Sequence, residues 1–263
     1  MKLFRKLLFL SVCCCIPTIS QPLTLKRVIV ASDANPLYLD FWPLVAHAWE
    51  RLTGLRPTLA LIAEDNVIVD ETCGDVVRFK PIPGVPDGFY AQHIRHLVPA
   101  YFEDEGCLIS DIDMFPLSKD YFIESVRDMP EDAYVVYRDK AYTYERFPMC
   151  YSAAKGKVFK EMFKLKSLSH IPQIIEAWHK MNLGWNSDER LLHHYVTHWS
   201  DYATRCIKLG GGVEKRVDRT KWEYDPVKVK AGYYIDSHSL RPYLKYKTHI
   251  DTLLKCLPVD VFN

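Results

Sequence analysis

A short apolar run that ends in two aspartates constrains the fold of this chain more than any other stretch. The stretch is GCLISDIDMFPL, residues 106–117. Residues 107–109 have the continuous apolar character of a buried strand, and Pro116 closes the stretch because proline cannot continue a central ladder. Asp111 and Asp113 follow the strand, where a relaxed pleat lets their side chains converge. Such a pair suits a hard divalent cation that keeps places for substrate phosphates.

The alternative is two solvated acids in a turn, because Asp-x-Asp also occurs by chance. The surrounding pattern favours a site, since the apolar residues would carry both acids to the carboxyl edge of a buried sheet, where open α/β sheets bind ligands. Helical spacing is predicted at 37–52, 89–102, 158–163, 171–181 and 190–199, and apolar strands at 26–31, 58–63, 76–79, 107–109 and 134–137. We therefore predict a single α/β domain of Rossmann-like type, with a mostly parallel central sheet flanked by helices.

Length, charge and missing motifs exclude several classes of protein. The 263 residues, 48% of them hydrophobic, can bury one substantial core. A net charge of +1 gives no argument for nucleic-acid binding. No Gly-x-Gly-x-x-Gly follows the first strand and no Walker lysine motif occurs, so a dinucleotide-binding Rossmann enzyme and a P-loop NTPase are both disfavoured.

The N-terminus forms a separate unit. Lys2, Arg5 and Lys6 precede an apolar run at 7–19 that is short for a membrane span. A basic region followed by a short apolar region is typical of an export signal, with a short uncleaved membrane anchor as the alternative. We expect residues 1–22 to be one of these and residues 23–263 to be the folded domain. The protein would then be exported or associated with endomembranes, and cytoplasmic if the segment is not a signal.

Taken in order, these parts resemble glycosyltransferases of the GT-A fold, the nucleotide-diphospho-sugar transferases. The piece FYAQHIRHLVPAYFEDEGCLISDIDMFPL is similar to a segment of glycogenin-like and large-algal-virus transferases, in which a helix with a donor-binding basic residue leads into the Asp-x-Asp strand. The resemblance covers residues 26–242 in order of elements and is specific at 92–117, 186–191 and His238. It implies metal-dependent transfer of a sugar from a nucleotide-diphosphate sugar, UDP by default, to a hydroxyl acceptor such as a glycan.

The resemblance also implies roles for particular residues. Asp111 and Asp113 would hold Mn²⁺ or Mg²⁺ on the donor diphosphate, with His238 as a further ligand, although a lone histidine is otherwise structural or solvated. Arg95, with Gln92 one turn before it, would meet the ribose or a phosphate; the alternative is a surface arginine. The other residues expected to bind the donor, in the nucleoside pocket, are Ala31, Ser32, Asp33, Asn35 and Asp65.

Asp188 and Glu189 match the acidic position at the head of an acceptor-side helix, where inverting transferases place their catalytic base. Asn186 or Ser187 would cap this helix, so both acids would lie in its first turn. The alternative is a helix start with favourable dipole charges, but the preceding Gly-Trp favours a cleft. We expect an inverting reaction, in which a base that takes the acceptor proton contributes ~10²–10⁴-fold. In a retaining reaction Asp188 would position substrate.

Two other functions fit parts of the pattern. A phosphatase of the haloacid-dehalogenase type also has an apolar strand before Asp-x-Asp, but it expects Thr or Val where this chain has Phe115. A degenerate module that only binds a nucleotide sugar or glycan is the second. The intact Asp111, Asp113 and His238 argue against it, because binding alone needs no complete metal site. Release of nucleoside diphosphate with acceptor present would separate a transferase from a binding module.

Overall fold

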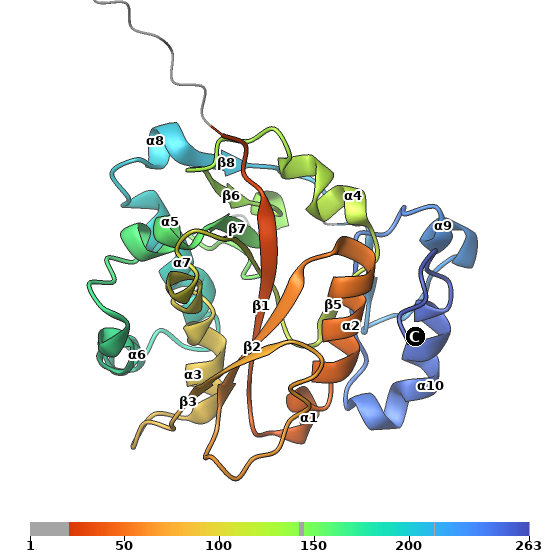
Figure 1. Ribbon diagram of the computed structural model, residues 1–263, viewed down its shortest axis with the longest axis horizontal. Helices are drawn as coiled ribbons and strands as arrows, with labels where there is room; N and C mark the ends of the chain where they lie inside the picture. Colours follow the sequence, from red (N-terminus) through yellow and green to blue (C-terminus); the bar gives the residue numbers. More distant parts are fainter. Residues whose placement is uncertain (1–20, 142–144, 213, 263) are drawn as a thin grey trace, which may run out of the picture.

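A seven-stranded sheet forms the centre of the computed structural model (Figure 1), which describes residues 21–141, 145–212 and 214–262. The strand order is β3-β2-β1-β4-β7-β6-β8. β7 runs antiparallel to its neighbours β4 and β6, and the other pairings are parallel. The predicted mostly parallel sheet is therefore confirmed, and the proposed signal or anchor lies almost wholly outside the described residues. The strands are β1 (Leu25–Asp33), β2 (Arg56–Ile62), β3 (Asp75–Phe79), β4 (Gly106–Ile109), β6 (Tyr134–Val136), β7 (Ser152–Lys155) and β8 (Cys206–Lys208).

The apolar run of β1 builds the two layers of the core. Side chains alternate along a strand, so Val28 and Val30 pack in the core on one face while Ile29 packs in the core on the other. The parallel neighbour β4 holds Ile109 opposite Ile29. A central strand buried on both faces needs apolar residues at every position, which is why the run is continuous rather than alternating.

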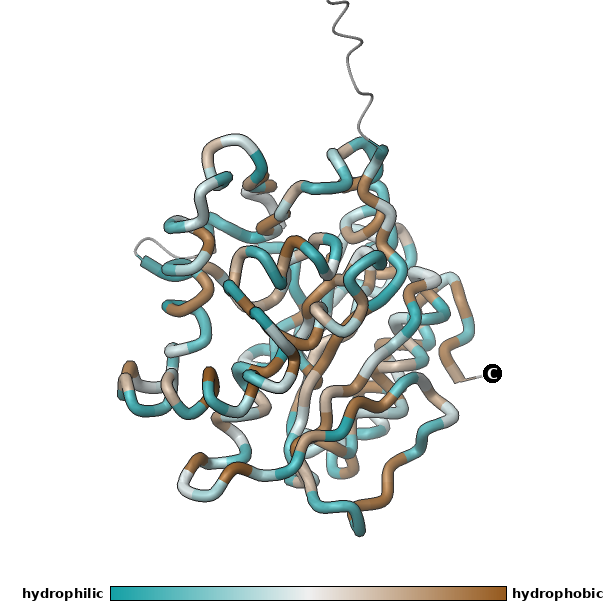
Figure 2. The backbone as a smooth tube through the Cα atoms, turned by 60° about the vertical axis from the view of Figure 1, so that its left-hand side comes forward, coloured by the Kyte–Doolittle hydropathy of each residue, from teal (hydrophilic) through white to brown (hydrophobic). Residues whose placement is uncertain are grey.

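Helices cover both faces of the sheet (Figure 1). One core contains α2 (Trp42–Thr53) and α10 (Tyr243–Leu254); the other contains α3 (Asp87–Ile94), α5 (Gly156–Met162), α6 (Ile171–Lys180) and α7 (Ser187–Thr197). Figure 2 shows apolar and polar residues alternating along the outer helices, because one side of each faces the sheet. Within the described ranges, no helix is long and apolar enough to cross a bilayer. The short helices are α1 (Pro36–Leu39), α4 (Lys119–Phe122), α8 (Tyr202–Arg205), α9 (Pro226–Lys230) and the 3₁₀ turns η1 (Val98–Tyr101), η2 (Glu124–Val126), η3 (Asp139–Ala141) and η4 (Leu168–His170).

Two predicted helices differ from the structure at prolines. The helix expected at 37–52 is divided into α1 and α2, with Pro43 in the first turn of α2, a position that proline favours. The helix expected at 89–102 ends at Ile94, and Pro99 lies in η1. A proline inside a helix would lose a backbone hydrogen bond, so the chain turns before it. Arg95 consequently lies just beyond the end of α3.

A small second sheet brings distant segments to the Asp-x-Asp motif. Its order is β5-β10-β9, made of β5 (Met114–Pro116), β10 (Asp236–His238) and β9 (Arg216–Asp218). His238 in β10 lies opposite Met114 on one side and opposite Asp218 on the other. Because Asp113 directly precedes Met114, this register places the late histidine beside the second aspartate of the motif.

Candidate active site

The Asp-x-Asp motif lies at the carboxyl edge of the central sheet. The Ser110 amide donates to the Ile29 carbonyl at 2.9 Å, so pairing with β1 continues one residue beyond β4. The chain then turns, because the Met114 amide donates to the Asp111 carbonyl at 3.2 Å. Ile112 is buried within this turn. As a result the two carboxylates, Asp111 and Asp113, face different partners.

Arg95 joins the first aspartate of the motif to the head of α7. Its guanidinium forms one ion pair with Asp111 and a second with Asp188, where Nη2 lies 3.3 Å from Oδ2. A planar fork of donors suits two carboxylates at once. Arg95 is only 6% exposed, so the alternative of a surface arginine is wrong. Its expected contact with the ribose or a phosphate stays a prediction.

The two acids of α7 lie in its first turn, as predicted. Asp188 is buried, and burial raises the pKa of its carboxyl against the opposing effect of the Arg95 charge. Glu189 is more accessible, with its Oε2 at 3.5 Å from Nη1 of Arg146. Asn186 occupies the cap position, but its side chain makes no capping hydrogen bond there, which differs from the expected cap.

The second aspartate, Asp113, faces three basic side chains. Its Oδ2 lies 2.6 Å from Nη1 of Arg219, 3.5 Å from Nε of Arg241 and 3.7 Å from Nε2 of His238. Asp113 is itself buried. The site therefore places two guanidinium groups and one imidazole around one carboxylate, at an edge where a ligand can approach.

Asp218 fixes the direction of His238. The Asp218 Oδ2 lies 3.1 Å from Nδ1 of His238, which leaves Nε2 facing Asp113. Burial raises the pKa of Asp218, but hydrogen bonds from Thr220 and His238 outweigh this effect and hold that pKa at about 2. Burial also lowers the pKa of His238, which favours the neutral imidazole that can ligate a metal. A carboxylate behind the other ring nitrogen is the usual support of a metal-binding histidine.

The predicted metal ligands are brought together only in part. Asp113 and His238 lie side by side, whereas Asp111 faces Arg95. Across residues 21–141, 145–212 and 214–262, no three His, Cys, Asp or Glu side chains are grouped so that they could hold one metal ion. Asp113 and His238 fit a shared ion by donor type and orientation. Asp111 would join them only after its ion pair with Arg95 opens.

The residues expected in the nucleoside pocket follow β1 and β2. Ala31 and Ser32 are buried, so their side chains belong to the interior of the fold. Asp33 Oδ1 accepts from the Asn35 amide at 3.1 Å, and Asn35 caps α1. Asp65 is exposed and forms an ion pair with Lys80. These loops share the carboxyl edge of the parallel strands with Asp111, but the pocket itself stays a prediction.

The sequence-based prediction missed Arg219 and Arg241. The signal was weak: Arg219 lies in a basic segment at 215–222, and Arg241 three residues after His238. Spacing alone could not show that both reach Asp113, because β9 and β10 bring them there. Arg241 also lies 4.9 Å from the ring centroid of Tyr38, which connects it to the segment after β1.

Comparison of the structure with solved structures identifies the fold. No protein-family model matches the sequence, and no curated protein matches it. The structure is similar to that of the galactosyltransferase LgtC in complex with donor and acceptor sugar analogues, with a TM-score of 0.50 and 12% identity over 88% of this chain and 94% of that chain. An active-site mutant of LgtC matches with a TM-score of 0.50 and 12% identity, over 86% of this chain and 95% of that one. The chain therefore has the GT-A glycosyltransferase fold.

A second transferase is less similar. The glycosyltransferase GlyE of Streptococcus pneumoniae TIGR4 matches with a TM-score of 0.46 and 13% identity, over 90% of this chain and 53% of that one.

Proposed function

We propose that this protein is a metal-dependent glycosyltransferase, which moves a sugar from a nucleotide-diphosphate sugar to a hydroxyl acceptor such as a glycan. One observation carries the proposal: two charged clusters meet at the carboxyl edge of a GT-A sheet, on either side of the Asp-x-Asp turn. The diphosphate cluster consists of Asp113, Arg219, His238 and Arg241. The acceptor cluster consists of Arg95, Asp111 and Asp188.

The diphosphate cluster suits the leaving group of such a transfer. When the sugar–phosphate bond breaks, negative charge grows on the nucleoside diphosphate, and fixed cations stabilise it. Arg219 and Arg241 are two guanidinium groups on one carboxylate, and phosphate oxygens can be bound by the same donors. Asp113 and His238 would hold Mn²⁺ or Mg²⁺, with Asp111 as a further ligand. A bound divalent ion would neutralise diphosphate charge. UDP is the proposed nucleotide by resemblance.

The acceptor cluster suits the removal of the acceptor proton. The raised pKa of Asp188 makes its carboxylate a better proton acceptor, and Arg95 holds it in place. Glu189, next to it and more accessible, is the second candidate for the base. We propose an inverting reaction on this basis. The anomeric configuration of the first-formed product, followed by NMR, tests it; retention would leave Asp188 in a positioning role.

The remaining alternatives are separated by turnover. The GT-A fold gives no support to a phosphatase of the haloacid-dehalogenase type, and an aryl-phosphate assay would expose that activity. A degenerate binding module would bind a nucleotide sugar without releasing nucleoside diphosphate. Release of the diphosphate in the presence of a glycan, and formation of a glycosylated product, would establish transfer.

The first experiment is thermal unfolding of the protein with a panel of nucleoside diphosphates and nucleotide sugars, each with Mn²⁺ and with EDTA. A ligand of the folded state raises the midpoint by mass action. A shift with one nucleotide sugar that is lost in EDTA would support metal-dependent donor binding and name the donor. Absence of any shift in a folded sample would contradict the proposal.

We also propose that the protein is membrane-associated through its N-terminal segment. The backbone is bonded to the folded domain from residue 21 onward. The Gln21 carbonyl accepts from the Glu131 amide at 2.8 Å, and the Leu23 amide donates to the Met129 carbonyl at 2.7 Å. Glu131 forms ion pairs with Lys155 and Lys157. A segment anchored immediately before residue 21 would therefore hold this end of the domain against the lipid surface.

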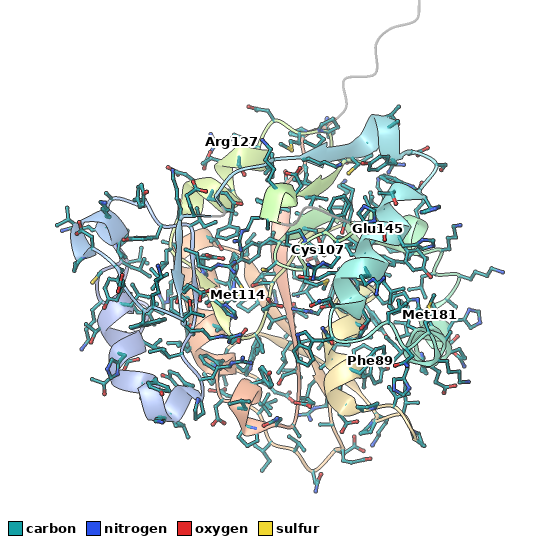
Figure 3. All side chains as sticks on the ribbon, turned by 180° about the vertical axis from the view of Figure 1, so that it is seen from behind. Phe89, Cys107, Met114, Arg127, Glu145 and Met181 are labelled. Carbon is teal, nitrogen blue, oxygen red and sulfur yellow. The ribbon has the colours of Figure 1, made fainter. Side chains whose placement is uncertain are left out.

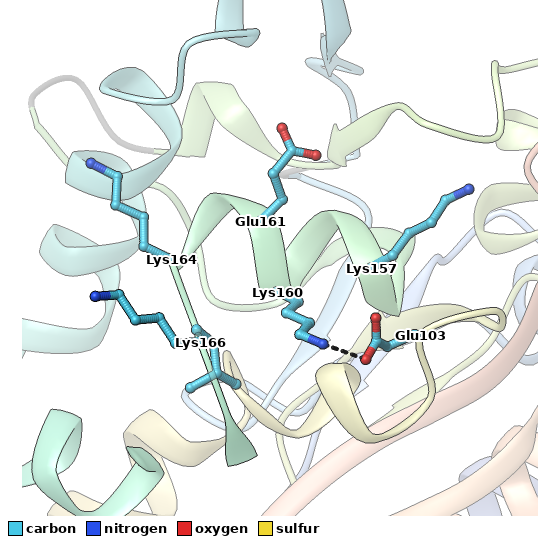
Figure 4. A pocket seen from close by; sticks show the side chains of 7 residues that line it. Glu103, Lys157, Lys160, Glu161, Lys164 and Lys166 are labelled. Atoms are coloured by element: carbon cyan, nitrogen blue, oxygen red, sulfur yellow. Dashed lines mark hydrogen bonds and ion pairs between the residues drawn. The ribbon is translucent and has the colours of Figure 1, made fainter. Parts of the chain in front are cut away.

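A basic surface begins at Lys157, which pairs with Glu131 at that end of the chain. Lysines of α5 and the following loop line an open hollow there (Figure 4). Its volume is about 430 Å³. Glu103 pairs with Lys160 at 2.6 Å and offsets part of the charge. Lysines near an anionic leaflet contribute ~1 kcal/mol each to binding. We define the basic surface as Lys157, Lys160, Lys164 and Lys166.

A further inference from the structure

One tryptophan differs from the other five in the chain. Trp185 is 79% exposed, whereas the remaining tryptophans are buried or half-buried. A single exposed apolar residue is ordinary on a protein surface, so exposure alone implies no function. The position of Trp185, three residues before Asp188, makes it informative. The other tryptophans are Trp42, Trp49, Trp178, Trp199 and Trp222.

The backbone of Trp185 is held while its indole is left in solvent. Gly184 has φ of +81°, and the Ser187 amide donates to the Gly184 carbonyl at 3.2 Å, which forms a tight turn before α7. Gln92 Nε2 donates to the Trp185 carbonyl at 2.9 Å. The turn is thus tied to α3, and the side chain is presented from a fixed backbone.

Gln92 connects this turn to the acceptor cluster. It lies one turn before Arg95, and its carbonyl accepts from Arg95 Nε at 3.2 Å, while the Arg95 guanidinium pairs with Asp188. Gln92 therefore contacts the Trp185 carbonyl through its side-chain amide and, through its own carbonyl, the guanidinium that pairs with the proposed base. An indole displayed at this position borders the proposed acceptor site rather than a remote surface.

A second apolar side chain lies at the start of the same loop. Met181, directly after α6, is 54% exposed. The end of α6 packs on α3, where the ring centroids of His179 and Phe89 are 5.0 Å apart. Met181 and Phe89 are both labelled in Figure 3. The loop at 181–187 therefore carries two exposed apolar side chains, Met181 and Trp185, and its Trp185 end is tied to Gln92 beside the charged site. Apolar walls with a few placed polar groups are typical of sites that bind small molecules.

We propose that Trp185 is a stacking platform for a sugar ring of the acceptor, which makes a glycan the acceptor class. This inference rests on the proposed transferase function. A pyranose presents C–H groups on one face and hydroxyls at its edge, and an aromatic ring packs on the first while polar groups bind the second. Asp188 and Glu189, three and four residues further along the chain, would receive hydroxyls of the same ring.

A membrane surface is the other partner that an exposed tryptophan could meet. The proposed membrane-facing end and the charged site lie at opposite ends of β1. Gln21 precedes the start of the strand, whereas Asp111 and Arg95 lie at the carboxyl edge. A bilayer against the Gln21 end would therefore not cover Trp185. We commit to a glycan, and the vesicle arm of the experiment tests the membrane.

The direct test is acrylamide quenching of tryptophan fluorescence in the full chain, because Trp185 is the exposed tryptophan. The probes are lactose, cellobiose, maltose and mannobiose, each added with UDP and Mn²⁺. We expect one disaccharide to protect a quenchable fraction that W185F lacks. Failure of all four to protect it overturns the platform, as does protection by phosphatidylserine vesicles alone.

Kinetics with the disaccharide that protects provides the second readout. W185A is expected to raise the KM for that acceptor tenfold or more, while donor affinity measured without acceptor stays at the wild-type value. V227A, which truncates an exposed residue of α9, is the matched control and should leave acceptor KM unchanged. An unchanged acceptor KM in W185A overturns the platform but keeps the transferase. Protection of Trp185 without any transfer keeps the platform and contradicts the transferase.

Discussion

Arg95 and Asp188 form a buried ion pair across 93 residues of sequence, with Nη2 and Oδ2 3.3 Å apart. Both side chains are less than a tenth exposed. The same guanidinium holds Asp111, so one cation fixes the first acid of the Asp-x-Asp motif relative to the head of α7. The pair thereby sets the spacing between the proposed donor and acceptor sides of the site.

Removal of Arg95 should destabilise the fold. R95M leaves the buried Asp188 carboxylate without its partner, and breaking a buried pair costs about 3–5 kcal/mol. Urea unfolding measures the loss. R127M is the control, because Arg127 pairs with Glu124 at the surface, where such pairs are worth about 0–1 kcal/mol. An equal, small loss of unfolding free energy in both variants would show that the buried pair does not stabilise the fold.

Substitution of the second motif aspartate should remove the metal-dependent part of donor binding. D113N keeps the shape of the side chain but removes the charge that would ligate Mn²⁺, so calorimetry should show donor affinity that no longer differs between Mn²⁺ and EDTA. R219A, by contrast, should weaken binding about tenfold in both conditions, because it removes one of the two guanidinium groups proposed to bind the diphosphate. Undiminished Mn²⁺-dependent binding by D113N would sink the metal assignment.

Two conservative variants should separate the catalytic base from its neighbour. D188N and E189Q each replace a carboxylate by an amide and keep the size of the side chain. The base variant should lose ~10²–10⁴-fold in kcat while donor affinity is kept, and the other should lose much less. Single-turnover rates with saturating donor measure this. If both variants retain nearly the full transfer rate, neither residue is the base.

Acid should destabilise the protein through buried histidines of the α3 segment. His93 and His96 are fully buried against aromatic rings, and burial lowers the pKa of His93 to about 4 and that of His96 well below 6.5. Below pH 6.5 the unfolded chain binds protons that the folded chain does not, so the free energy of unfolding falls as pH drops. For His93 the loss reaches about 3 kcal/mol near pH 4.

H93Q tests this pH dependence. Unfolding by urea between pH 8 and pH 4.5 should show a shallower fall for H93Q than for wild type, since one proton-binding site of the unfolded chain is gone. The comparison at pH 8, where both histidines are neutral, corrects for any change in packing. Identical slopes in the two proteins would rule out His93 as a source of the acid sensitivity.

The basic surface should strengthen binding to anionic membranes. Flotation of the full chain with phosphatidylserine vesicles should exceed flotation with phosphatidylcholine vesicles. K164Q/K166Q should weaken anionic binding by about 2 kcal/mol, at ~1 kcal/mol for each lysine near the surface. K228Q/K230Q on α9 makes the same charge change elsewhere. Equal effects of the two double variants would contradict a specific membrane-facing surface.

The sequence predicted the sheet well because buried strands carry a local signal. The runs around β1, β2 and β4 are apolar on both faces, and the structure places each within two residues of the prediction. Helix ends were predicted less well, because Pro43 and Pro99 change the backbone locally and the hydrophobic spacing does not show it. The first-turn position of Asp188 and Glu189 also followed from local pattern.

The charged contacts of the site could not be predicted in the same way. Asp113 and Arg219 lie 106 residues apart, and they meet because β9 pairs with β10, which pairs with β5. The spacing of residues along the chain does not predict the register of these strands. The turn after β4 likewise directs Asp111 toward Arg95 and away from the predicted metal site at Asp113 and His238.

The sequence by itself determined that an α/β sheet forms and that two acids follow a central strand, because apolar periodicity and turn residues act over a few neighbouring positions. The tertiary structure decided which cation each acid contacts and that Trp185 is exposed at a turn held by Gln92. These outcomes depend on strand register and helix packing between distant segments, so they are properties of the assembled fold.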